Sequence, residues 1–129
     1  QDIGSWDVFN VTDMRYMFAN TRVFNQDIGN WDVSNITDMR GMFYEAPAFN
    51  QDIGSWDVSN VTDMSFMFRQ DTLSTDNYDA LLIGWSSLTL QSGVFFDGGG
   101  SQYSSGAQSA RNILTDVYNW TISDGGMTD

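Results

Sequence analysis

The 129-residue sequence contains no cysteine, no histidine and no lysine. Without cysteine it has no disulfide framework, no thiolate metal site and no thiol nucleophile. Without histidine it cannot assemble the Ser–His–Asp or Cys–His arrangements that many hydrolases use. It also lacks an apolar run long enough to cross a bilayer.

The charge is almost entirely of one sign, because sixteen Asp and one Glu stand against five Arg, for a net charge of −12. Such a chain repels the phosphates of nucleic acids and anionic lipid surfaces. Its hydrophobic content of 41% is too high for a disordered segment, and its length suffices for one core. We therefore expect one folded domain that binds no nucleic acid and inserts into no membrane.

A 25-residue unit occurs three times, as residues 1–25, 26–50 and 51–75, and thirteen of its 25 positions are identical in all three copies. A fixed period in this range is typical of a solenoid, in which each coil stacks on the next. The chain starts at a repeat boundary with no initiator Met and no signal peptide. We therefore expect further coils or another domain before Gln1.

Each coil is predicted to contain a short strand and a one-turn helix. Trp6 and Val8 alternate with polar residues, as in a strand, whereas Met14, Met17 and Phe18 have helical spacing. Stacking would align the tryptophans into one core column of Trp6, Trp31 and Trp56.

Two columns of polar residues have a structural interpretation. Asp13, Asp38 and Asp63 precede the predicted helical turn, where a carboxylate caps free N–H groups. Asn10, Asn35 and Asn60 are expected to form a ladder, each amide bonding to the coils above and below. These Asn also begin N-x-T sequons, but the ladder explains their period better than glycosylation does.

Residues 1–73 are thus predicted to be the repeats, and residues 74–129 a capping segment of the same domain. A helix is expected to start after Ser74, with Tyr78, Leu81, Leu82 and Trp85 on its apolar face. A strand at residues 94–96, a second helix from about Ser105 and a last strand at residues 120–122 would follow. Such a cap covers the core and the strand edge that an open solenoid exposes.

Asp7, Asp32 and Asp57 form an outward-facing column, since their neighbours point inward. With the flanking positions they make a candidate binding face of Ser5, Asp7, Phe9, Asn30, Asp32, Ser34, Ser55, Asp57 and Ser59. Stacked carboxylates repel one another, so this column needs compensation. Solvent and hydrogen bonds from Ser, Asn or backbone N–H groups are the favoured explanation, and Ca²⁺ bound by Asp7, Asp32 and Asp57 is the alternative.

The copies differ most at positions 19–23, and Arg15, Arg22, Arg40 and Arg69 lie there or at the variable position 15. We interpret these positions as a solvated helical side. The alternative is that variation on a constant frame tunes recognition.

The stretch FNQDIGSWDVSNVTDMSFMF resembles the repeat of BspA-like leucine-rich-repeat surface proteins and of a related domain of unknown function found in mycoplasma surface proteins. The stretch that follows it resembles the segment that closes such arrays in secreted bacterial proteins. This resemblance implies a curved, right-handed solenoid related to leucine-rich repeats, displayed outside the cell. It implies roles in adhesion and supplies no catalytic residue.

We therefore expect an α/β fold: a right-handed leucine-rich-repeat-like solenoid with an α/β cap. A row of equivalent Asp is unlike the two distinct carboxylates of a glycosidase, so no enzyme is expected. The predicted function is an extracellular module of a bacterial surface protein that binds a protein or glycan ligand, with no cofactor unless Ca²⁺ binds. The alternative is a structural spacer within a larger secreted protein, joined to neighbouring domains of the same chain.

Overall fold

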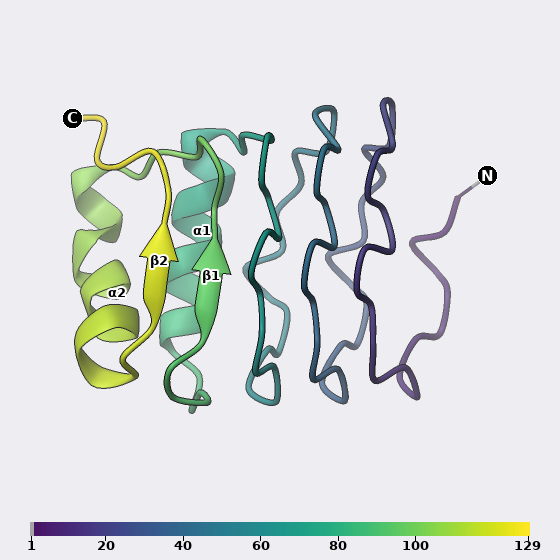
Figure 1. Ribbon diagram of the computed structural model, residues 1–129, viewed down its shortest axis with the longest axis horizontal. Coiled ribbons are helices and arrows are strands. Elements are labelled where there is room, and N and C mark those ends of the chain that lie inside the picture. Colours follow the sequence, from purple (N-terminus) through teal and green to yellow (C-terminus); the bar gives the residue numbers. More distant parts are fainter. Residues whose placement is uncertain (1) are drawn as a thin grey trace.

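A computed structural model describes residues 2–129, and Gln1, the first residue of copy one, lies outside the described residues. The three repeat copies lie side by side along the long axis, and the C-terminal helices and strands continue the row (Figure 1). The two termini lie at opposite ends of this row (Figure 1).

The helices and strands of residues 2–129 all lie in the C-terminal part. α1 (Thr75–Ser86) is followed by β1 (Phe95–Asp97), by a continuous helical segment made of η1 (Ser105–Ala107), α2 (Gln108–Asn112) and η2 (Ile113–Val117), and by β2 (Thr121–Ser123). β1 and β2 pair in parallel. The order is therefore helix, strand, helix, strand.

The copies are joined by backbone hydrogen bonds that follow the sequence period. We call residues 12–20, 37–45 and 62–70 the ladder segments. In copy one, the N–H groups of alternate residues donate to carbonyls of copy two at 2.8–3.0 Å: Met14 to Asp38, Tyr16 to Arg40, Phe18 to Met42 and Asn20 to Tyr44. Copy two donates to copy three with the same offset of 24 residues, over the same range of distances. The ladder thus fixes the register of the copies.

Among the other N–H groups of the ladder segments, those of Thr37 and Thr62 donate to the preceding copy, to the carbonyls of Thr12 and Thr37 at 2.9 and 2.8 Å. Three further N–H groups of each of the first two copies bond within their own copy. Those of Met17 and Ala19 close turns onto the carbonyls of residues 14 and 16. That of Arg15 donates to Asp13 Oδ1 at 2.9 Å. The invariant Asp therefore supplies an acceptor to an N–H group that no backbone carbonyl reaches.

The predicted one-turn helices are wrong, because the ladder segments are successive turns. Repeat position 16 has a left-handed φ in all three copies, +56° at Tyr16 and +60° at Gly41 and Phe66, and so has position 20. A left-handed residue every fourth position is incompatible with an α-helix. Asp13, Asp38 and Asp63 consequently cap turns and do not start helices.

The predicted strands at residues 6–8, 31–33 and 56–58, which we call the WDV segments, are also wrong, because no strand forms there. These segments reach the preceding copy through tryptophan. Trp31 Nε1 donates to the Ile3 carbonyl and Trp56 Nε1 to the Ile28 carbonyl, both at 3.0 Å. The strand-like pairing therefore lies on the side where the sequence predicts helix.

The buried apolar side chains of the copies and the cap form one continuous core. Trp31 and Trp56 are 4% and 1% exposed, whereas Trp6 at the end of the row is 46% exposed. Phe43 stacks on Phe18 and Phe68 of the flanking copies, with centroids 5.8 and 5.1 Å apart. Columns of rings thus run through the row.

α1 occupies the place of a fourth WDV segment. Its Trp85 Nε1 donates to the Ile53 carbonyl at 3.2 Å, which repeats the bonds of Trp31 and Trp56. The helix lies so close to copy three that a Cβ on Gly84 would overlap the carbonyl of Gly54. Ser74 caps the helix by accepting from the Asn77 N–H.

β1 continues the ladder on the other side, in front of α1 in Figure 1. The N–H groups of Met64 and Phe68, four residues apart, donate to the carbonyls of Phe95 and Asp97, two residues apart. Copy three therefore bulges against β1, whereas the copies match one another residue for residue. Phe66, at the centre of the bulge, is exposed.

A buried polar cluster ties the cap together. Tyr78 on α1 donates to Asp124 Oδ2 at 2.6 Å, and Arg111 on α2 donates to the same oxygen at 2.9 Å. Burial, then the neighbouring Asp124 charge, raises the pKa of Tyr78 well above its ordinary value. The cluster satisfies a nearly buried carboxylate where α1, α2 and the chain after β2 meet.

Asp71 is the least satisfied charged group of the interior. It is 4% exposed, its Oδ1 accepts from the Thr72 N–H at 2.7 Å, and its Oδ2 makes no hydrogen bond. Burial raises the pKa of Asp71 from 3.8 to about 6, against the opposing effect of the Thr72 bond. Copy two has the buried Ala46 at this repeat position.

Replacing Trp56 by Ala is expected to lower the free energy of unfolding by about 3–5 kcal/mol, because it opens a cavity inside the row. Trp6→Ala removes the same side chain where it is half exposed, and we expect a loss of about 1 kcal/mol. Urea unfolding followed by circular dichroism measures both losses. Equal losses would contradict the burial gradient along the tryptophan column.

Stability is expected to fall as the pH rises from about 4 to about 6, because the folded chain keeps a proton on Asp71 that the unfolded chain releases. The loss is at most about 3 kcal/mol and is complete above the folded-state pKa. Asp71→Asn should remove this decline, as should Asp71→Ala, which copies Ala46. Urea unfolding between pH 4 and pH 7 tests this, and an unchanged slope in both variants would refute it.

Candidate functional site

The candidate binding face predicted from the sequence lies on the side of the WDV segments. Its side chains are exposed or half-buried: Ser5, Asp7, Phe9, Asn30, Asp32, Ser34, Ser55, Asp57 and Ser59. Acidic Asp2, Asp27 and Asp52 lie at the neighbouring repeat position 2. This side is therefore acidic in every copy.

The outward Asp column is compensated by local hydrogen bonds. Asp7, Asp32 and Asp57 each accept through Oδ1 from the backbone N–H two residues further on, all at 3.1 Å. The hydroxyl of Ser34 also donates to Asp32 at 2.6 Å, and this bond, followed by the backbone one, lowers the pKa of Asp32. These carboxylates therefore hold the turn after each WDV segment.

The calcium alternative finds no geometric support in the described part of the chain. Among residues 2–129, no three acidic side chains lie close enough together to hold a metal ion. The stacked carboxylates of Asp7, Asp32 and Asp57 each face their own turn.

The Asn column bonds differently from the predicted ladder. Asn35 Nδ2 donates to the Phe9 carbonyl at 2.8 Å, and Asn60 Nδ2 donates to the Ser34 carbonyl at 2.7 Å. Each amide thus binds the backbone of the preceding copy and not the next Asn. This role is structural, as the sequence indicates.

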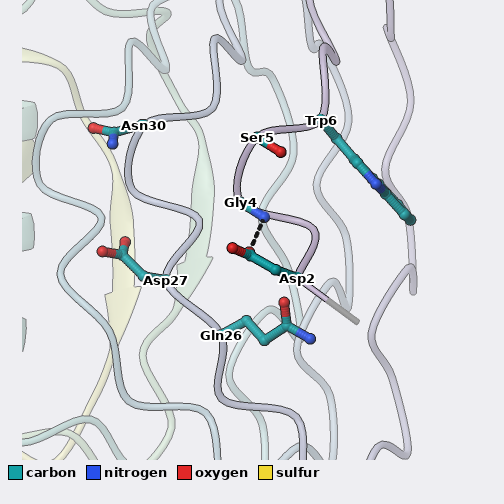
Figure 2. Close-up of a pocket in the computed structure, with 7 residues that line it drawn as sticks. All are labelled: Asp2, Gly4, Ser5, Trp6, Gln26, Asp27 and Asn30. Carbon is teal, nitrogen blue, oxygen red and sulfur yellow. Dashed lines mark hydrogen bonds between the residues drawn. The ribbon is translucent and has the colours of Figure 1, made fainter.

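A hollow opens at the edge of the first two copies, lined by Asp2, Gly4, Ser5, Trp6, Gln26, Asp27 and Asn30. Figure 2 shows that its side chains do not converge, since Asp27 and Asn30 point to one side and Trp6 extends to the other. Asp2 accepts from the Gly4 N–H at 2.8 Å (Figure 2). The hollow has no concentrated set of polar groups aimed at one point.

A second hollow lies on the ladder side of the molecule, the side that carries the ladder segments, β1 and β2. We call it the aromatic groove. It has a volume of about 290 Å³ and is lined by Tyr16, Tyr44, Phe66, Arg69 and Gln70.

The groove arises because the three copies differ at repeat position 16. Copies one and three place the half-exposed rings of Tyr16 and Phe66 there, and copy two has Gly41. The Tyr16 ring lies over Gly41, where a Cβ would overlap it. The groove lies beside these rings, and its other lining residues come from positions 19 and 20 of copies two and three.

The Arg residues of the ladder side divide into paired and unpaired groups. Arg15 pairs with Asp13 at 2.9 Å, and Arg40 pairs with Asp63 at 3.0 Å. The Arg15 hydrogen bond lowers the pKa of Asp13. Arg69 has no acidic partner within residues 2–129, and its guanidinium lies 5.3 Å from the centre of the Phe66 ring. The groove therefore contains an uncompensated cation.

A neighbouring hollow of about 300 Å³ continues this surface over the bulge between copy three and β1. It shares Phe66 and Arg69 with the aromatic groove and adds Phe95 and Thr121. Phe95 is 60% exposed. The Phe66–Arg69 pair is thus the wall between two adjoining hollows.

The favoured sequence interpretation, a solvated helical side, does not indicate this surface, whereas the alternative, that variation tunes recognition, includes its Tyr44, Arg69 and Gln70. Its lining residues are not shared between copies, so the repeat pattern does not mark them. The sequence signal for this surface is repeat position 16, which is Tyr16, Gly41 and Phe66 in the three copies. A glycine between two aromatic residues at one position of a stack indicates that the side chains there do not form a uniform column.

None of the helices in residues 2–129 is long and apolar enough to cross a membrane.

Asp57→Ala is expected to lower the melting temperature by a few degrees, because the Ser59 N–H loses its acceptor. Asp57→Asn keeps an acceptor oxygen and should cost less. Millimolar Ca²⁺ should have the same effect on the melting temperature of the wild type and of the variant. A calcium-dependent stabilisation seen only in the wild type would show that the column binds metal.

Comparison with known proteins places most of the chain in one family. No curated protein and no solved structure matches the chain. Residues 1–91, which cover the three copies and α1, match the family model described as Mycoplasma protein of unknown function. The chain belongs to this family, DUF285.

Proposed function

We propose that the chain is a non-catalytic recognition module of a bacterial surface protein, and that it binds a protein or glycan through its ladder side. The observation that carries the proposal is the aromatic groove, where exposed rings and an unpaired guanidinium adjoin on a backbone held in register. Aromatic residues and Arg dominate the binding energy of protein interfaces.

The frame beneath the groove supports this role. The ladder bonds of the copies are made by backbone atoms and by Asp13, Asp38 and Asp63, so the outward side chains at positions 16, 19 and 20 carry no part of the frame. Residues that tolerate the left-handed φ of positions 16 and 20 can therefore replace one another there without loss of the ladder bonds. A constant frame with a variable surface suits recognition.

We also propose that the three repeat copies form a right-handed solenoid related to the BspA-like leucine-rich repeats. The constant 24-residue offset of the ladder bonds and the aligned tryptophans favour it. A location on the cell surface agrees with the acidic surface and with membership in a Mycoplasma family. Absence of histidine and cysteine in the sequence argues for binding over catalysis.

A structural spacer is the second candidate, and one observation favours it. Stacked phenylalanines and in-register hydrogen bonds run from copy one to copy three, which makes the row stiff along its long axis. A stiff row can also bind a ligand. A spacer role alone does not explain why aromatic rings are exposed at the groove.

The test uses two substitutions that each replace an exposed Phe by the residue that another copy has at the same position. Phe66→Gly copies Gly41 and suits the left-handed φ, so the fold should be unaffected. Phe9→Ser copies Ser34 and Ser59 on the WDV side. Wild type and variants are applied to an array of matrix proteins and glycans.

We expect binding to an array component to be reduced at least about tenfold by Phe66→Gly, as for a central aromatic contact, and to be kept by Phe9→Ser. Loss of binding in the Phe9→Ser variant alone would show that the binding site lies on the WDV side. Equal binding by all three proteins would contradict the groove as the site, and no binding to any array component would leave the spacer as the better account.

A further inference from the structure

We infer that the aromatic groove binds a carboxylate-bearing sugar unit, such as a uronic or sialic acid residue of a glycan. The inference rests on the proposed function and adds the chemical class of the ligand. It depends on the rings, the cation and the free polar atoms that line the groove.

The rings provide a surface for one face of a sugar. The Tyr16 ring of copy one lies over Gly41, in the space that a side chain of copy two would take at position 16, and Phe66 of copy three is the next ring at this position along the row. The electron-rich face of an aromatic ring attracts the slightly positive C–H groups of a pyranose ring. A flat saccharide unit therefore finds apolar contacts on the rings that line the groove.

The charge of the groove selects an anionic ligand. Arg69 is the only charged residue among those that line it, and no carboxylate faces it there. This is unusual in a chain with a net charge of −12. Contact with Phe66 holds the guanidinium in place, and a guanidinium binds a carboxylate through two parallel hydrogen bonds.

The other lining groups suit hydroxyls. The Tyr16 and Tyr44 hydroxyls and the Gln70 amide have no hydrogen-bond partner within residues 2–129, so their donors and acceptors are available. A volume of about 290 Å³ is near the lower limit of small-molecule sites. The groove thus accommodates one sugar unit and not an extended polymer.

Long-range repulsion argues for a single acidic unit over a polyanion. The negative charge of the molecule repels a distant anion, but salt screens this repulsion beyond about 8 Å at physiological ionic strength. The contact with Arg69 is much shorter and is screened less. Affinity should therefore not fall steeply with salt, as it does for polyanion binding.

The test titrates the ¹⁵N-labelled chain with two acidic saccharides and their neutral counterparts. The methyl glycoside of galacturonic acid is compared with its methyl ester, and 3′-sialyllactose with lactose, so that the two pairs separate uronic from sialic acids. We expect one acid to bind at least about tenfold more tightly than its counterpart, with shifts confined to amides around the groove.

Two variants and a control separate the contributions. Arg69→Gln should remove the preference for the acid and leave binding of the neutral sugar unchanged. Phe66→Gly should weaken acid and neutral sugar alike. Arg22→Gln removes an exposed Arg that does not line the groove, so it should retain the preference.

Equal affinity for acid and neutral sugar, shifts away from the groove, or no binding of any of the four saccharides would overturn the inference. If the saccharides fail while a protein on the array still binds and is sensitive to Phe66→Gly, the ligand is a protein. The proposed function then stands and the sugar inference falls.

Discussion

The structure depends on one constraint, that the N–H groups of the ladder segments find acceptors in the next copy. Four alternate N–H groups of each of the first two copies do so with a constant offset of 24 residues. Two others close turns, one donates to the invariant Asp, and those of Thr37 and Thr62 donate to the preceding copy. An unsatisfied buried N–H is costly, so this pattern fixes both the register and the left-handed residues at positions 16 and 20.

The division of the molecule into two sides follows from this constraint. The WDV side is locked by tryptophan, by Asn and by the turn-forming Asp column, and it stays similar in all copies. On the ladder side the backbone makes the bonds, so the outward side chains are free to differ. The aromatic groove, the unpaired Arg69 and the exposed Phe95 all lie there.

Much of the packing could be predicted from the sequence. The 25-residue period alone aligns Trp31 with Trp56, and the capping residue Ser74 followed by a helical apolar pattern predicts α1. The assignment of strand and helix within a copy could not be predicted. Met14, Met17 and Phe18 have helical spacing because successive turns also return side chains to the core, and a left-handed φ at Tyr16 or Phe66 leaves no sign in the sequence.

The sequence favours the WDV side as the candidate binding face for the same reason. A strand there presents Asp7, Asp32 and Asp57 as repeated outward carboxylates. The structure gives each of them a turn to hold. The groove is built from residues that change between copies, and only the stacking of Gly41 between two aromatic copies makes it visible.

Amide hydrogen exchange measured by NMR tests the central claim most directly. The ladder predicts slow exchange for the N–H groups of Gly41 and Phe43, which bond to copy three, and fast exchange for that of Asp32 in the WDV segment. Slow exchange at Asp32 together with fast exchange at Gly41 and Phe43 would contradict it, because the copies would then pair through the WDV segments.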